Sequence, residues 1–108
     1  MSKKVLILGS KGLVGSSLNR HLSKDEEYEI ITSTRKDTDL FKSAEVNELL
    51  KKSQPDFVIN AAAKVGGIQA NNIFRADFIY DNLSIQTNII KGCFEAKINN
   101  LIFLGFTW

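Results

Sequence analysis

The chain has 108 residues, which is enough for one domain at most. Hydrophobic residues make up 44% of it and charged residues 24%, so the composition excludes an intrinsically disordered chain and allows an apolar core. A formal net charge of +2, with basic and acidic residues interspersed, argues against a nucleic-acid partner.

The only cysteine, Cys93, cannot form an internal disulfide or a site built from several thiolates, so we predict no metal site. A reducing compartment fits this cysteine content. The apolar run near the N-terminus, Val5 to Leu8, is shorter than the roughly 7 to 15 apolar residues of a signal sequence. No stretch approaches the roughly 20 apolar residues of a membrane span. We therefore expect a cytoplasmic protein without a membrane partner.

Strand and helix patterns alternate along the chain. Short apolar runs rich in β-branched residues predict strands at residues 5–8, 28–33, 57–59 and 101–104. Apolar residues at helical spacing predict helices at residues 13–22, 43–52 and 74–96. A short extended piece is expected at residues 38–40. This alternation predicts an α/β fold, a doubly wound parallel sheet of the Rossmann type.

The helical patterns also predict which side chains face the core. In the first helix these are Leu13, Val14, Leu18 and Leu22, and in the second Val46, Leu49 and Leu50. The long third helix carries a broad apolar stripe made of Phe74, Phe78, Leu83, Ile85, Ile89, Ile90 and Phe94. The stripe is wide enough to serve a partner as well as a core, so a homodimer through residues 74–96 is one expectation.

The segment between the first strand and the first helix has three regularly spaced glycines. It consists of Gly9, Ser10, Lys11, Gly12, Leu13, Val14 and Gly15. A glycine at the strand end permits a tight turn, a second lets the backbone approach a pyrophosphate, and a third allows close packing of helix on strand. The phosphate would meet the N–H groups at the positive end of the helix dipole. We predict a dinucleotide site here, with a purely structural turn as the alternative.

The residue after the second predicted strand bears on the choice of dinucleotide. In NAD-binding folds an acidic residue about 20 residues after the glycines binds the ribose 2′-hydroxyl, whereas this chain has Arg35 there. A guanidinium pairs bidentately with a 2′-phosphate, and Lys36 and Lys11 are further candidates. We therefore predict NADP(H) in preference to NAD(H). In the alternative, Arg35 is a solvated loop residue near Asp37 and Asp39.

The segment from Pro55 to Asn88 carries a more specific signature. It contains NAAAKVGGI at residues 60–68, followed by ANN and IYDNL. With these motifs the chain resembles the GDP-L-fucose synthase family, NADP-dependent epimerase/reductases among the extended short-chain dehydrogenase/reductases. The resemblance runs from Val5 to about Gly105 but spans only about the first third of a typical family enzyme.

The resemblance implies further cofactor contacts. The glycine loop would hold the pyrophosphate and Arg35 the 2′-phosphate. Additional positions beside the cofactor would be Asp39, Leu40, Ala61, Ala62, Ala63, Leu104 and Gly105. Residues 64–72 would lie near the nicotinamide and the sugar. Asn82 resembles a buried asparagine that supports the active site in the family, and a hydrogen-bonded core residue is the alternative.

The family's catalytic residues have no counterpart in this sequence. The resemblance implies a tyrosine in a YxxxK motif and a nearby serine or threonine, but neither Tyr28 nor Tyr80 has a lysine four positions on. Phe106 stands at the serine position, and the family pattern is lost over residues 106–108. We therefore assign no catalytic residue, interpret His21 as a surface residue and Cys93 as a core residue, and expect a truncated form.

Taken with the resemblance, these observations predict the N-terminal, NADP(H)-binding part of an oxidoreductase/epimerase that acts on the nucleotide sugar GDP-4-keto-6-deoxymannose. Residues 1–108 would be one partial Rossmann domain, the substrate domain would be absent, and the chain alone would be inactive. The alternative is a non-catalytic module that binds NADP(H) or a partner. In either case residues 101–104 would form an exposed apolar edge strand, which is prone to aggregation.

Overall fold

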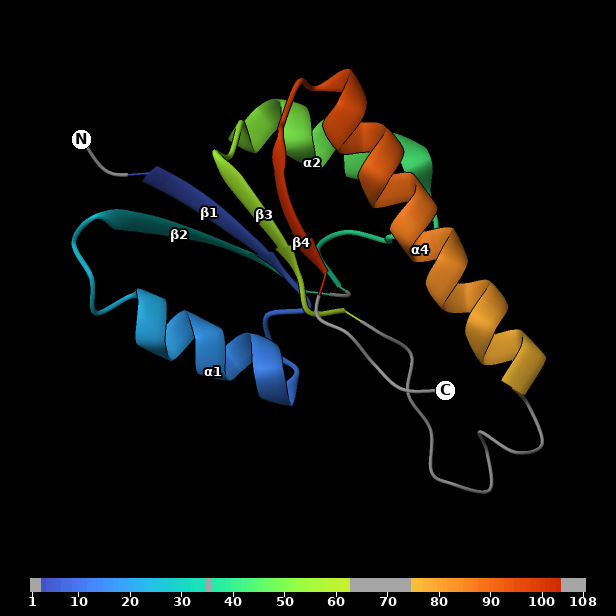
Figure 1. Cartoon of the computed structure of the whole chain (residues 1–108), viewed down its shortest axis with the longest axis horizontal. Helices are drawn as coiled ribbons and strands as arrows, with labels where there is room; N and C mark the ends of the chain where they lie inside the picture. The colour runs from blue at the N-terminus through green and yellow to red at the C-terminus, as the bar shows by residue number, and fades with distance from the viewer. Residues whose placement is uncertain (1–2, 35, 63–74, 104–108) are drawn as a thin grey trace.

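The computed structural model of the chain describes residues 3–34, 36–62 and 75–103. Strands and helices alternate through this part, in the order predicted, as Figure 1 shows. Their bounds are β1 (Lys3–Leu8), α1 (Leu13–Leu22), β2 (Tyr28–Ser33), α2 (Ser43–Ser53), β3 (Phe57–Asn60), α4 (Arg75–Glu95) and β4 (Asn100–Phe103). The predicted ends of α1 and β2 agree with these bounds, and those of the other elements differ by at most two residues. None of the described helices is long and apolar enough to cross a membrane.

The four described strands form one parallel sheet in the order β2-β1-β3-β4. Val5 of β1 pairs with Ile30 on one side and with Phe57 of β3 on the other, and Phe57 pairs with Asn100 of β4. The chain therefore leaves β1 in one direction for β2 and continues in the other for β3 and β4. The predicted α/β fold with an open parallel sheet is confirmed, and its order reverses at β1.

One face of the sheet packs against α2 and α4, which lie on the same side in Figure 1. This larger core contains Leu6, Leu8, Val46, Leu50, Val58, Ile85, Ile89 and Cys93. The two helices approach closely at Gly92, where an added Cβ would lie 2.8 Å from Leu50 Cδ1. Cys93 is buried and His21 is exposed, which confirms both interpretations. Burial also raises the pKa of the Cys93 thiol.

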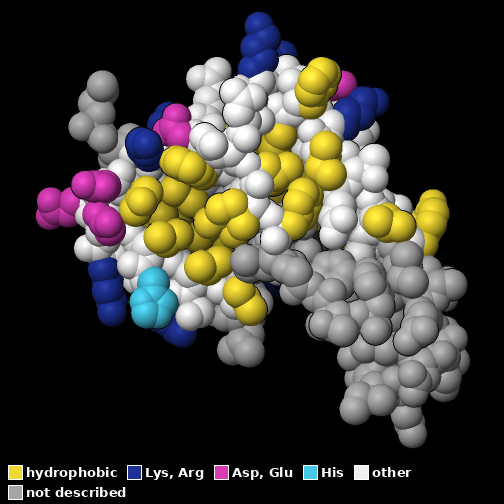
Figure 2. Space-filling view, viewed as in Figure 1, with side chains coloured by type: hydrophobic (Ala, Val, Ile, Leu, Met, Phe, Trp, Pro, Cys, Tyr) yellow, Lys and Arg dark blue, Asp and Glu magenta, His cyan; other side chains and the backbone are white. Residues whose placement is uncertain are grey.

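The other face has only α1 over it among the described helices. Val5, Ile7 and Ile59 form the smaller core there, with Leu18 and Leu22 of α1 packed against them. Ile102 of β4 pairs with Ile59 and so belongs to the same face, yet 48% of it is exposed. Figure 2 shows hydrophobic side chains gathered over the sheet on the side facing the viewer. Among the described strands β4 lies at one edge of the sheet, and Ile102 is an exposed apolar side chain on it.

The structure refines three details of the sequence-based expectation. Residues 38–40 form no strand, because the Thr38 amide turns back to the Thr34 carbonyl oxygen and the Lys42 amide to the Asp39 carbonyl oxygen. Val14 is 51% exposed, since it lies in the first turn of α1 beside the glycine loop instead of over the strands. The stripe on α4 divides between two faces: Ile85 and Ile89 are buried, whereas other members are exposed. The exposed described members are Leu83, Ile90 and Phe94.

Candidate functional site

A pocket lies at the carboxyl ends of β1, β2 and β3, where the strand order reverses. Its volume of about 790 Å³ falls within the range of small-molecule and cofactor sites, roughly 300 to 1,000 Å³. Its walls come from three strand ends, the glycine loop, the segment before α2 and one turn of α4. The lining residues are Leu8, Gly9, Lys11, Gly12, Ser33, Thr34, Lys36, Thr38, Asp39, Leu40, Phe41, Ala61, Ala62 and Ile85. In open parallel sheets, ligands bind at this position.

The outer two glycines of the loop are required by the protein itself. Gly9 has a φ of 76°, and a Cβ there would lie 2.7 Å from the Ala62 amide nitrogen. A Cβ on Gly15 would overlap the Gly9 carbonyl oxygen. Both contacts are with backbone, which cannot move aside easily. These two glycines let the loop, the first turn of α1 and the end of β3 pack together.

Gly12 differs from both, because nothing in the described structure requires a glycine there. Its φ of −70° and ψ of 170° suit any residue, and an added Cβ would meet only the Gly9 carbonyl oxygen, at an ordinary 3.4 Å. Gly12 lines the pocket and is the N-cap residue of α1. A methyl group at this position would occupy the space in front of the helix N-terminus.

The N-terminus of α1 is capped neither by a side chain nor by an acidic residue of its own first turn. The free N–H groups and the helix dipole there favour an anionic group. Together with Lys11, which also lines the pocket, this end of the site is suited to a phosphate.

The glycine loop is tied to the end of β2 through Ser33. The Ser33 carbonyl oxygen accepts hydrogen bonds from the amides of Gly9 at 3.1 Å and Ser10 at 3.3 Å, and from the Ser10 hydroxyl at 3.3 Å. The Ser33 hydroxyl in turn donates to Thr38 Oγ1 at 3.0 Å. Ser10, Ser33 and Thr38 are all buried. This network fixes the glycine loop relative to the turn that follows β2.

That turn is built around Asp37. Its Oδ2 accepts hydrogen bonds from the Thr34 amide at 3.0 Å and the Thr34 hydroxyl at 2.9 Å. These bonds, and then the nearby charge of Lys11, hold the pKa of the Asp37 carboxyl below its ordinary value. Lys11 and Lys36 both line the pocket and are exposed. Lys36 of this turn and Lys11 of the glycine loop therefore place two cations in the lining of the site.

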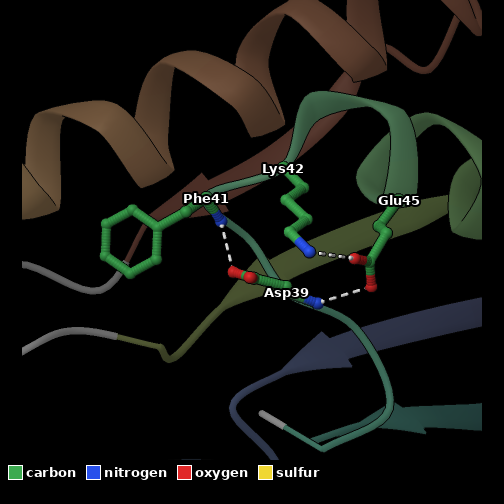
Figure 3. A network of polar contacts seen from close by, with 4 residues as sticks. All are labelled: Asp39, Phe41, Lys42 and Glu45. Carbon is green, nitrogen blue, oxygen red and sulfur yellow. Dashed lines mark hydrogen bonds and ion pairs between the residues drawn. The ribbon is translucent and has the colours of Figure 1, made fainter.

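A further wall of the pocket is formed by the segment before α2, drawn in Figure 3. Asp39 Oδ1 accepts a hydrogen bond from the Phe41 amide at 3.0 Å, and the Asp39 amide donates to Glu45 Oε1 at 3.1 Å. Lys42 Nζ lies 3.8 Å from Glu45 Oε2. The Asn88 side chain on α4 donates to the Leu40 carbonyl oxygen at 2.9 Å. Two helices thus hold this wall in place.

The comparison with known families agrees with this geometry. The sequence model described as the NAD dependent epimerase/dehydratase family matches residues 5–106. The chain belongs to this family. No group of three or more His, Cys, Asp and Glu side chains suited to a metal ion occurs among the residues that the structure describes.

Within this epimerase/dehydratase family, curated relatives include GDP-L-fucose synthases. The enzyme from Sinorhizobium fredii is 46% identical over 95% of this chain, and the one from Escherichia coli is 43% identical over 97%. A solved GDP-mannoheptose C4 reductase from Campylobacter jejuni, with NADP bound, is 36% identical over 96% of this chain with a TM-score of 0.86. The chain spans about a third of the length of these relatives: 32% and 33% of the two curated enzymes and 33% of the solved chain.

The structure brings many of the predicted cofactor residues of this family member together. Those that line the pocket are Gly9, Lys11, Gly12, Asp39, Leu40, Ala61 and Ala62. Ser10 holds the loop through its hydrogen bond to Ser33, and Gly15 packs against the Gly9 carbonyl oxygen. Leu13 and Val14 begin α1. Asn82 is buried on α4. The predicted Arg35, Ala63, Leu104, Gly105 and the loop at 64–72 lie outside the described residues.

Six pocket residues were not predicted from the sequence: Leu8, Ser33, Thr34, Thr38, Phe41 and Ile85. Ser33 and Thr34 stand at the end of β2, and the rule that sites form at the carboxyl ends of parallel strands would have included them. For Phe41 the signal was an aromatic residue in a mostly polar segment before α2. Ile85 gives no local signal, because only the packing of α4 against the sheet brings it to the pocket.

Proposed function

We propose that the chain binds NADP(H) in this pocket, as the N-terminal part of an epimerase/reductase that acts on GDP-4-keto-6-deoxymannose. Residues 1–108 would then be one partial Rossmann domain, inactive alone and cytoplasmic. The family and the NADP-bound relative support the cofactor, and the curated GDP-L-fucose synthases support the substrate. A non-catalytic NADP(H)- or partner-binding module is the alternative for the chain by itself.

The observation that carries the cofactor proposal is the space in front of Gly12. Gly9 and Gly15 are explained by contacts within the protein, but Gly12 is not. A ligand whose pyrophosphate approaches the backbone there supplies the missing reason for a glycine. The positive end of α1 and the Lys11 side chain would neutralise its charge. When bound, NADP(H) would supply a hydride for reduction of a keto sugar.

A preference for the phosphorylated dinucleotide is supported by the turn after β2. Lys11, Lys36 and Thr34 line the pocket. Arg35 stands between Thr34 and Lys36 in the sequence. The carboxylate of Asp37 already accepts two hydrogen bonds from Thr34. We propose that Arg35, with Lys36 and Lys11, holds the 2′-phosphate, a charge that an unphosphorylated ribose lacks.

Isothermal titration with NADPH and NADH tests these assignments. We expect the parent chain to bind NADPH at least tenfold more tightly than NADH. Gly12→Ala should lower NADPH affinity more than tenfold with little loss of stability, whereas Lys24→Ala, at the other end of α1, should leave it unchanged. Lys36→Ala should weaken NADPH and leave NADH unaffected. Equal affinity for both dinucleotides would contradict the 2′-phosphate site, and normal NADPH binding by Gly12→Ala would contradict the pyrophosphate site.

An assay of NADPH oxidation tests whether the chain is inactive alone. Incubated with NADPH and GDP-4-keto-6-deoxymannose, the chain should bind the cofactor but oxidise none of it above the rate without protein. Loss of the 340 nm absorbance of NADPH, dependent on both the chain and the sugar nucleotide, would show that the chain is active alone.

A second proposal concerns the outer face of α4, and its partner is a second copy of the chain. Tyr80, Leu83, Ile90 and Phe94 are between 50% and 82% exposed and recur at helical spacing. Two such apolar faces can cover each other across a two-fold axis. Sedimentation equilibrium of the parent chain should therefore give a dimer, and Leu83→Lys with Ile90→Lys a monomer. Glu48→Lys, an exposed change on α2, should leave the dimer intact; a monomeric parent would refute the proposal.

A further inference from the structure

Phe41 is an exposed aromatic residue at the mouth of the pocket. It is 51% exposed, in a turn where a polar residue would be the usual choice. It lines the pocket together with Thr38 and Leu40. In Figure 3 its ring points away from the Asp39, Lys42 and Glu45 network. Single exposed apolar residues are common on protein surfaces. An aromatic ring in the wall of a cofactor-sized pocket has a more specific meaning.

The backbone beneath the ring is held before any ligand binds. The Phe41 amide donates to Asp39 Oδ1 at 3.0 Å, and the Lys42 amide donates to the Asp39 carbonyl oxygen at 3.0 Å. The Asp39 amide donates to Glu45 in the first turn of α2, and the Asn88 side chain of α4 donates to the carbonyl oxygen of Leu40, the residue before Phe41. A ring on a preorganised backbone loses little freedom on binding a ligand, which favours tight contact.

The pocket lining combines two kinds of surface. Lys11, Gly12 and Lys36 provide cations and N–H groups, whereas Leu40, Phe41 and Ile85 provide apolar surface. A ligand that matches both kinds of surface has phosphates joined to a flat, uncharged ring. A purine base fits this description, because its face stacks on an aromatic side chain.

We propose that the ring of Phe41 is the stacking surface for the adenine of the bound dinucleotide. This inference rests on the proposed NADP(H) site and adds a residue that determines affinity for the base. Stacking of a base on an aromatic ring corresponds to a change in affinity of about tenfold or more on truncation to alanine. Because the ring is half exposed, its removal should affect the ligand more than the fold.

The test compares Phe41→Ala with Phe41→Tyr, which keeps the ring. Titrated with NADP⁺ and with 2′,5′-ADP, Phe41→Ala should bind both about tenfold more weakly than the parent, and Phe41→Tyr within about twofold of it. Denaturant unfolding without ligand shows whether the variants fold equally. Phe41→Trp provides a direct readout: stacking of adenine should quench its fluorescence by more than that of the parent, whose one tryptophan is Trp108.

The outcomes separate this inference from the proposal beneath it. If the parent binds neither NADP⁺ nor 2′,5′-ADP, both the cofactor site and the stacking role are refuted. If the parent binds them and Phe41→Ala binds equally well, only the stacking role is refuted. A loss of affinity in Phe41→Tyr as large as in Phe41→Ala would also overturn it, because the aromatic face would then not be the cause.

Discussion

The side-chain amide of Asn88 donates a hydrogen bond of 2.9 Å to the carbonyl oxygen of Leu40, 48 positions earlier in the chain. This bond joins α4 to the pocket wall that precedes α2. Asn88→Ala leaves that carbonyl without its partner, so we expect a loss of about 1 kcal/mol in the free energy of unfolding. Because Leu40 and Phe41 line the pocket, NADPH affinity should also fall several-fold.

Urea unfolding and calorimetric titration measure the two effects of Asn88→Ala. Lys91→Ala, an exposed change on the same helix, serves as the control and should alter neither quantity. An Asn88→Ala variant with lower stability but unchanged affinity would mean that the hydrogen bond supports the core without shaping the pocket.

The close approach of Gly92 to Leu50 predicts that the effect of Gly92→Ala on the free energy of unfolding depends on the side chain at position 50. A Cβ at position 92 would lie 2.8 Å from Leu50 Cδ1 and 3.3 Å from Val46 Cγ1, and both of these side chains are buried. Replacing glycine by alanine in a helix ordinarily stabilises it by about 1 kcal/mol, whereas overpacking a core costs about 1 to 3 kcal/mol. We expect Gly92→Ala to be destabilising in the parent chain.

The same substitution should become stabilising once the space is opened. Leu50→Ala alone is expected to cost about 2 to 5 kcal/mol, and in that background Gly92→Ala should recover part of the loss. A double-mutant cycle in denaturant gives the interaction directly. Equal effects of Gly92→Ala in both backgrounds would show that the two positions do not crowd each other.

The sequence was sufficient for the fold because local and long-range signals agree. Val5 to Leu8 form a continuous apolar run, and all four are buried on β1, one of the two described strands with sheet neighbours on both sides. The loop after it needs Gly9 and Gly15 for backbone packing. Where the patterns failed, the reason was tertiary: the spacing of Leu83 and Ile85 on α4 does not reveal which of them will meet the sheet.

The candidate site was predictable only in part. Its glycine loop is contiguous in sequence and therefore visible, as are Asp39 and Leu40 once a resemblance points to them. Phe41 and Ile85 come from separate elements that meet only after α4 packs beside the segment held by Asn88. Such contacts depend on the packing of whole helices, which residue spacing does not specify.

Asp37 provides a pH-dependent test of the turn after β2. Hydrogen bonds from Thr34 favour the charged carboxylate and hold the pKa of Asp37 below 3.8, its ordinary value. A lowered pKa in the folded state means that the turn is stabilised above pH 3.8 and loses this contribution as the pH falls through the folded pKa. The carboxyl carbon of Asp37, followed by NMR, should titrate below 3.8.

Thr34→Val removes only the hydroxyl donor, so it should raise the pKa of Asp37 partway toward its ordinary value. The backbone N–H, which has the larger effect, remains. In Asp37→Asn the contribution of the turn should no longer depend on acid pH. A midpoint for the parent at or above 3.8 would mean that these hydrogen bonds are not maintained in solution.

The apolar edge formed by β4 should limit the solubility of the chain. Ile102 is 48% exposed on a strand that has a described neighbour on one side only. Unpaired edge strands recruit other chains, and a lysine on the edge opposes this. We expect Ile102→Lys to slow the growth of turbidity several-fold on mild heating, while the free energy of unfolding changes by about 0.5 kcal/mol or less, because the side chain is half exposed.

Thr32→Lys adds the same charge to an exposed position on β2, the opposite edge strand, and should have a much smaller effect. If both variants slow aggregation equally, net charge and not the β4 edge controls it.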